Sequence, residues 1–160
     1  MRILKIFGII VISIVVLFYA ANFAAKYWQS NLIKKDVNYI FEKNNVEVKN
    51  LKCTTPSLLS RGASCKFVPS DKNISIIAGK FKMEKVEKNN SNFSIDLKYG
   101  KYDPSACGIS DISKVDIYHS RVKAKEDELR IDNGTAFEEM IIFYDPNKES
   151  FCVQIGYAYG

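Results

Sequence analysis

The chain has 160 residues, of which 47% are hydrophobic, enough for one domain with its own core. Its 23 basic and 18 acidic residues give a formal net charge of +5 and are spread along the sequence. This weak and dispersed charge argues against a nucleic-acid-binding protein, which needs a concentrated basic surface.

The first element is an apolar stretch from Ile6 to Ala25 that contains no charged side chain. As a helix it covers about 30 Å, the thickness of the hydrocarbon core of a bilayer. The stretch is longer than the apolar part of a typical cleaved signal, and no Ala-x-Ala processing site follows it. Residues 1–25 are therefore predicted to be an uncleaved transmembrane signal anchor, with a cleaved signal as the alternative.

The charges around residues 6–25 predict the orientation of this span. Arg2, Lys5 and the terminal amine precede it, whereas Lys26 alone follows it closely. Because short segments rich in Lys and Arg stay in the cytoplasm, we expect a cytoplasmic N-terminus. The rest of the chain is then expected to be periplasmic or otherwise extracytoplasmic.

Four cysteines beyond the span support this topology. They form an even set without a C-x-x-C pair, which favours disulfides in an oxidising compartment over a zinc site, with buried free thiols as the alternative. The segment between Cys53 and Cys65 contains Pro and Gly, which let the chain double back. We therefore predict a local Cys53–Cys65 bridge and a long-range Cys107–Cys152 bridge that holds the last strand.

Residues 26–45 are predicted to continue the membrane helix outward as a helical stalk. The segment from Tyr27 to Asn45 lacks Gly and Pro. Its apolar side chains recur at helical spacing, and they are Trp28, Leu32, Val37, Tyr39, Ile40 and Phe41.

From Val46 onward the period of the apolar residues changes to two, which is typical of half-buried strands. A change of phase between Val48 and Leu51 indicates a bulge. The predicted strands lie around residues 46–53, 63–67, 77–83, 93–99, 115–124, 128–132, 140–144 and 151–159, and turn residues at 132–134 and 145–148 make their neighbours antiparallel. A candidate capping box at Thr135 and Glu138 leaves a helix as the alternative for residues 135–144. The predicted fold class is α+β: a membrane helix, a helical stalk, and a predominantly antiparallel sheet domain at 46–160.

The sequence shows no catalytic, cofactor or metal motif, so we expect a protein that is not an enzyme. His119 is the one histidine and lies in a predicted strand, where a packed or surface role is commoner than general-base catalysis. The acidic groups at 126–128 and 138–139 do not match an EF-hand loop. The glycines stand singly and form no phosphate-binding loop.

These features predict a membrane-anchored binding or assembly module of a bacterial cell envelope. Its partners would be the membrane, through residues 6–25, and an envelope protein or a lipid. A lipid-binding form of the module requires one apolar face of the sheet to stay open as a groove, and the candidate residues for that face are Phe93, Leu97, Tyr99, Tyr157 and Tyr159.

The layout of the first fifty residues supports an alternative. Gly8 lies at the start of the apolar run with Lys5 before it, and the run leads into a helix and then a sheet with a late disulfide. This layout resembles that of type IV pilins and pseudopilins, which are processed after a Gly. The resemblance implies a filament subunit whose mature chain begins at Ile9, and Ser13 stands where those families usually carry Glu.

Overall fold

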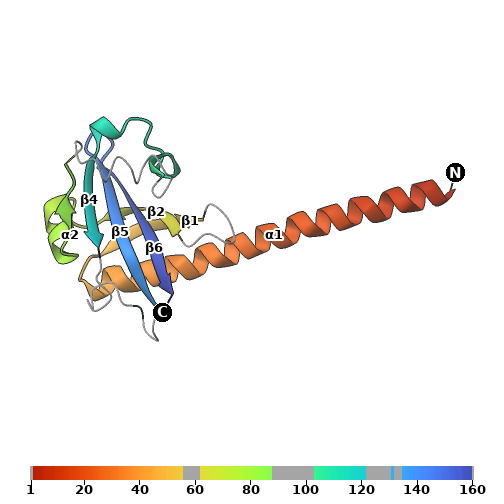
Figure 1. Cartoon of the computed structure of the whole chain (residues 1–160), viewed down its shortest axis with the longest axis horizontal. Helices are drawn as coiled ribbons and strands as arrows, with labels where there is room; N and C mark the ends of the chain where they lie inside the picture. Colours follow the sequence, from red (N-terminus) through yellow and green to blue (C-terminus); the bar gives the residue numbers. More distant parts are fainter. Residues whose placement is uncertain (1, 56–61, 88–102, 122–130, 132–134, 160) are drawn as a thin grey trace.

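The protein is an α+β structure in which one long helix leads into a six-stranded antiparallel sheet (Figure 1). A computed structural model describes residues 2–55, 62–87, 103–121, 131 and 135–159. The elements in chain order are α1 Arg2–Lys43, β1 Val48–Thr54, β2 Gly62–Pro69, α2 Ile74–Lys80, β3 Glu84–Lys85, the 3-10 turns η1 Pro104–Cys107 and η2 Ile112–Lys114, β4 Asp116–Arg121, β5 Thr135–Asp145 and β6 Ser150–Tyr159. The strand order in the sheet is β1-β2-β6-β5-β4-β3.

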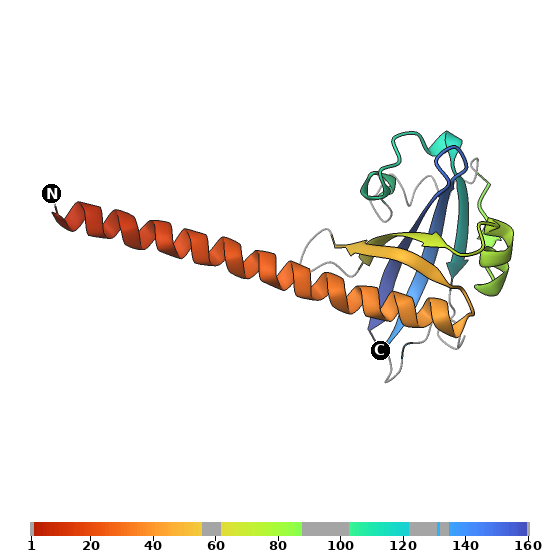
Figure 2. The ribbon, with the colours of Figure 1, turned by 180° about the vertical axis from the view of Figure 1, so that it is seen from behind.

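Helix α1 has two parts with opposite surroundings. Its 42 residues form one continuous helix, about 63 Å long at 1.5 Å per residue. The first part projects from the sheet, and its apolar side chains are exposed as far as Trp28 (Figures 1 and 2). From Ile33 onward one face of the helix is buried against the sheet. The predicted stalk is thus helical, and its last three turns belong to the core of the domain.

The buried end of α1 is held by aromatic side chains. The ring of Phe41 lies 4.9 Å from that of Phe67 on β2 and 5.2 Å from that of Phe81, which follows α2. Phe67 in turn contacts Phe151 on β6, and Phe151 contacts Tyr144 on β5 at 4.5 Å. This chain of rings joins both helices to three of the strands, and ring pairs at such separations attract beyond the effect of burial alone.

Both faces of the sheet are covered. Register partners on neighbouring strands share a face, and alternate residues along one strand lie on opposite faces. The face that packs on α1 and α2, here called the helix face, includes Val153 and Ile142. The opposite face, here called the loop face, includes Cys152 and Phe143 and packs on residues 103–115. The sheet is therefore the middle of three layers.

The β5–β6 hairpin confirms the strands predicted at 140–144 and 151–159, and β5 begins five residues earlier than predicted, at Thr135. The two strands pair from Thr135 with Tyr159 to Asp145 with Ser150. The Asp145 carboxylate accepts hydrogen bonds from the backbone N–H of Asn147 at 3.0 Å and from that of Lys148 at 3.4 Å, which fixes the turn. The predicted bulge in β1 is also present, between Lys49 and Lys52.

Two bridges join the cysteines in the predicted pairs. Cys53 and Cys65 are direct register partners on β1 and β2, with Cα atoms 4.0 Å apart. Cys107 at the end of η1 is bonded to Cys152 on β6, with Cα atoms 5.8 Å apart. The first bridge ties a hairpin together, and the second ties the loop layer to a central strand.

The predicted strand at 77–83 is wrong, because residues 74–80 form helix α2. The Asn73 side chain caps this helix by accepting a hydrogen bond from the backbone N–H of Ser75 at 3.0 Å. Ile74, Ile77 and Ala78 are buried at the i, i+3, i+4 spacing of one helix face. The apolar alternation from Ile77 to Met83 coincides with this helical pattern over too few residues to separate the two.

The apolar stripe predicted for residues 26–45 is also only partly buried. Val37, Ile40 and Phe41 lie in the core together with Ile33, whereas Trp28 and Leu32 are exposed on another side of α1. Three expected features fall outside the described residues, namely the strand at 93–99, most of the strand at 128–132 and the turn at 132–134.

A matched pair of substitutions on α1 tests whether its end belongs to the core. Ile40→Ala should lower the free energy of unfolding by about 2–5 kcal/mol, because Ile40 is fully buried. Leu32→Ala removes a similar volume from an exposed position and should change it by about 0.5 kcal/mol or less. Urea unfolding of the full chain in detergent, followed by circular dichroism, measures both, and equal effects would contradict the packing described.

The bridges should differ in their contribution to stability. Cys107 and Cys152 are 45 residues apart and Cys53 and Cys65 only 12, so loop-closure entropy predicts losses of about 4 and about 3 kcal/mol when each pair is replaced by Ala. Unfolding of the two double variants under oxidising conditions measures the difference. A larger loss for the Cys53/Cys65 variant would contradict this order.

Candidate functional site

Residues 103–115 cover the loop face of the sheet. Two Asp-x-Ser turns give this segment its shape. The Asp103 carboxylate accepts a hydrogen bond from the Ser105 backbone N–H at 2.9 Å and opens η1, and Asp111 does the same for Ser113 at 3.0 Å and opens η2. The hydroxyl of Ser113 donates to Asp111 as well and is the main reason that the pKa of this carboxyl is lowered. Gly108, with a φ of 75°, ends η1.

The side-chain amide of Gln154 fastens this segment to the sheet. Its oxygen accepts a hydrogen bond from the Asp103 backbone N–H at 3.0 Å, and its nitrogen donates to the Asp103 carbonyl. The same nitrogen lies 3.1 Å from the Ser64 hydroxyl oxygen. One buried amide thus satisfies both backbone groups of Asp103 beside the Cys107–Cys152 bridge.

A row of register partners crosses the loop face next to the Gln154 amide. Lys52 on β1 pairs with Lys66 on β2, and Lys66 pairs with Cys152 on β6. Cys152 pairs with Phe143 on β5, and Phe143 pairs with Ile117 on β4. Because register partners share a face, two lysines, a disulfide and two apolar side chains follow one another across the sheet.

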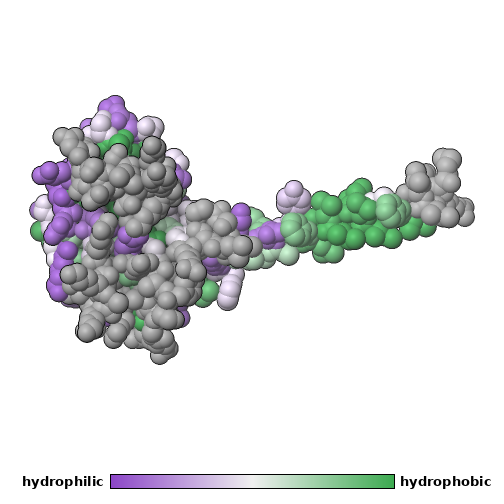
Figure 3. Space-filling view, viewed as in Figure 1, coloured by the Kyte–Doolittle hydropathy of each residue, from purple (hydrophilic) through white to green (hydrophobic). Residues whose placement is uncertain are grey.

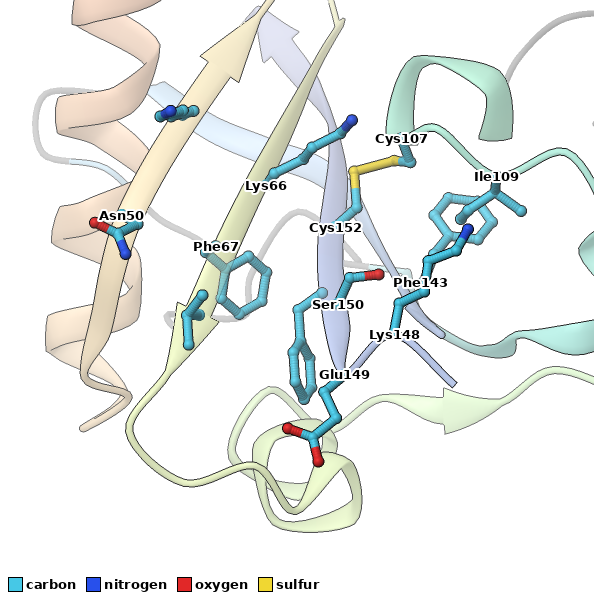
Figure 4. A pocket seen from close by; sticks show the side chains of 13 residues that line it. Asn50, Lys66, Phe67, Cys107, Ile109, Phe143, Lys148, Glu149, Ser150 and Cys152 are labelled. Atoms are coloured by element: carbon cyan, nitrogen blue, oxygen red, sulfur yellow. A yellow bond between two sulfur atoms is a disulfide. The ribbon is translucent and has the colours of Figure 1, made fainter. Parts of the chain in front are cut away.

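A groove of about 310 Å³ lies over the first part of this row (Figure 4). Its apolar floor consists of the partly exposed Ile109 above Phe143 and the Cys107–Cys152 bridge, which are buried. Lys66 lies on one side of the bridge and Lys148, from the β5–β6 turn, on the other (Figure 4). Among the described residues, the lining is Asn50, Lys52, Lys66, Phe67, Val68, Cys107, Ile109, Phe143, Lys148, Glu149, Ser150, Phe151 and Cys152.

The charges around the groove leave a positive edge. Glu149 accepts a hydrogen bond from Lys72, which raises the pKa of Lys72 and occupies the one carboxylate among the described lining residues. Lys148 lies 3.4 Å from the Asp145 carboxylate, a surface pair exposed to solvent on the lysine side. Within the described part of the chain, no ion pair involves Lys52 or Lys66.

His119 pairs with a carboxylate farther along the loop face. Its Nε2 lies 3.5 Å from Oε2 of Glu139, and both side chains are largely buried, with 16% and 13% of their surface exposed. Among the described residues, no three His, Cys, Asp or Glu side chains gather as metal ligands do. The sequence-based view that His119 is not catalytic stays a prediction.

The apolar face predicted from the sequence stays a prediction. Phe93, Leu97 and Tyr99 lie outside the described residues, and Tyr157 and Tyr159 lie on β6 without a described side-chain position. Sequence reasoning missed the groove because its walls come from β1, β2, β6 and the η1 segment. The one available signal was the alternation at 63–67, which puts Lys66 on the face opposite Cys65 and Phe67.

A second feature with functional meaning is the projecting part of α1. It is apolar on all sides and unburied. Figure 3 shows it as a continuous hydrophobic surface beside the sheet and its covering layers, here called the head, whose surface is mixed. By length and composition this helix can cross a membrane, either as an anchor or as a signal sequence. No family model matches the chain, and comparison with known proteins and solved structures finds no significant match.

Replacing the amide that fastens the loop layer should loosen that layer. Gln154→Met keeps the length of the side chain but leaves the Asp103 N–H and carbonyl without their partner, at an expected cost of about 2 kcal/mol in the free energy of unfolding. Limited proteolysis at residues 103–115 should accelerate in parallel. An unchanged unfolding midpoint with unchanged proteolysis would show that Gln154 does not hold the segment.

Proposed function

We propose that this chain is a membrane-anchored, extracytoplasmic binding or assembly module of a bacterial cell envelope. The observation that carries the proposal is the continuity of α1, which is unbroken from its exposed apolar part to its buried end. A helix satisfies its backbone groups internally, as a lipid environment requires, and the same helix then supplies core residues to the head. The head is therefore an extension of the anchor.

The spacing along α1 supports a head that lies close to the bilayer. The apolar stretch ends at Lys26, and the first core residue is Ile33, about 10 Å farther along the helix axis. Tyr27 and Trp28 lie between them with about two thirds of their surface exposed, at the level where aromatic side chains favour the lipid head groups. The position of the lysines and Arg2 supports a cytoplasmic N-terminus.

The cellular location of the head tests the proposed anchor. We expect the protein to stay with the membrane fraction after washing with alkaline carbonate, and protease added from the extracytoplasmic side to remove the head. Recovery of a soluble protein that begins after Ala25 would mean that the helix is a cleaved signal. Cleavage from the cytoplasmic side alone would reverse the proposed orientation.

A filament subunit is the second candidate, and the packing of α1 favours it. A projecting apolar half-helix, a second half packed on an antiparallel sheet and a disulfide that holds the last strand together resemble the layout of type IV pilins. The mass of the mature chain separates the two proposals. An intact Met1 supports the anchored module, and a chain that starts at Ile9 supports the filament subunit.

A further inference from the structure

The strongest unexplained feature of the head is the placement of two lysines directly opposite each other. Lys52 and Lys66 are register partners on neighbouring strands, and both are exposed on the loop face. Like charges in directly opposed positions destabilise a sheet. A bound anion between the two ammonium groups would remove this repulsion.

The groove adds an apolar surface and a third lysine to this pair. Its apolar surface is supplied by the partly exposed Ile109, above the buried Phe143 and Cys107–Cys152 bridge. Lys148, which also pairs with Asp145, lies beyond the bridge as seen from Lys66 (Figure 4). The order across the groove is therefore cationic, apolar, cationic. At about 310 Å³ the groove is at the small end of ligand sites, so it suits a few side chains better than a large molecule.

We propose that this groove binds an acidic peptide segment of a partner protein, with two carboxylates on either side of an apolar side chain. An extended peptide presents alternate side chains to one surface at a spacing of about 7 Å, which suits an acidic-x-apolar-x-acidic pattern. The proposal rests on the proposed assembly function and names the kind of partner.

Other anions match the groove less well. A single phosphate can contact the Lys52–Lys66 pair but leaves the exposed part of Ile109 uncovered. An anionic lipid has its charge at one end, so its apolar tail would lie against the ammonium group of Lys148. Charge on both sides of an apolar floor is complementary to a peptide that alternates acidic and apolar groups.

The test uses the full chain in zwitterionic detergent and the rhodamine-labelled peptide Asp-Ser-Phe-Ser-Asp, with Asn-Ser-Phe-Ser-Asn as the control. Fluorescence anisotropy should show that the acidic peptide binds about tenfold more tightly, and that binding weakens at high salt. The double variant Lys52→Gln/Lys66→Gln should weaken binding about fivefold or more. The matched variant Lys34→Gln/Lys35→Gln, which removes two exposed lysines from α1, should leave it unchanged.

Three other results would overturn the proposal. Equal losses in the two double variants would show attraction to overall charge, and no saturable binding up to about 1 mM peptide would show that the groove does not take this ligand. Binding of inorganic phosphate or of phosphatidylglycerol micelles, without binding of the acidic peptide, would assign the lysines to a phosphate or a lipid. Because these measurements use purified protein, they are independent of the tests of anchoring and orientation.

Discussion

The packing of Phe41 joins α1, whose first part is apolar and exposed, to the folded sheet. This residue lies near the end of α1, is fully buried, and contacts Phe67 and Phe81 from two other elements. The helix could otherwise end in solvent as a flexible tether. Because the last turns of α1 are core residues, the sheet cannot complete its helix face without the segment that continues the exposed apolar helix.

The loop face depends on a different kind of interaction. Its apolar cluster is small, and it is supplemented by the Cys107–Cys152 bridge and by the two hydrogen bonds between Gln154 and Asp103. A covalent bond and a satisfied buried amide hold the 103–115 segment where few apolar contacts are available. The groove exists because this segment is fixed at one side of the sheet and leaves the Lys66 side open.

Elements with long, regular patterns could be predicted from the sequence. The helix to Lys43, the β5–β6 hairpin, the bulge in β1 and the cysteine pairs follow from periodicity and turn residues. Helix α2 could not be predicted, since its seven residues also fit an alternating strand. The groove depends on register: the bulge between Lys49 and Lys52 shifts the pairing by one residue and brings Lys52 opposite Lys66. A one-residue shift reverses the faces, and the sequence alone does not measure it.

Because α1 is unbroken, a change in its tilt also moves the head. From Lys26 to the end of α1 at Lys43 the axis extends about 26 Å, so a tilt of about 20°, ordinary for membrane helices, displaces that end sideways by about 9 Å. Bilayer thickness influences tilt through the match between apolar length and lipid. If the apolar part of α1 spans a bilayer as proposed, a change of lipid composition would move the groove through the stiffness of this one helix.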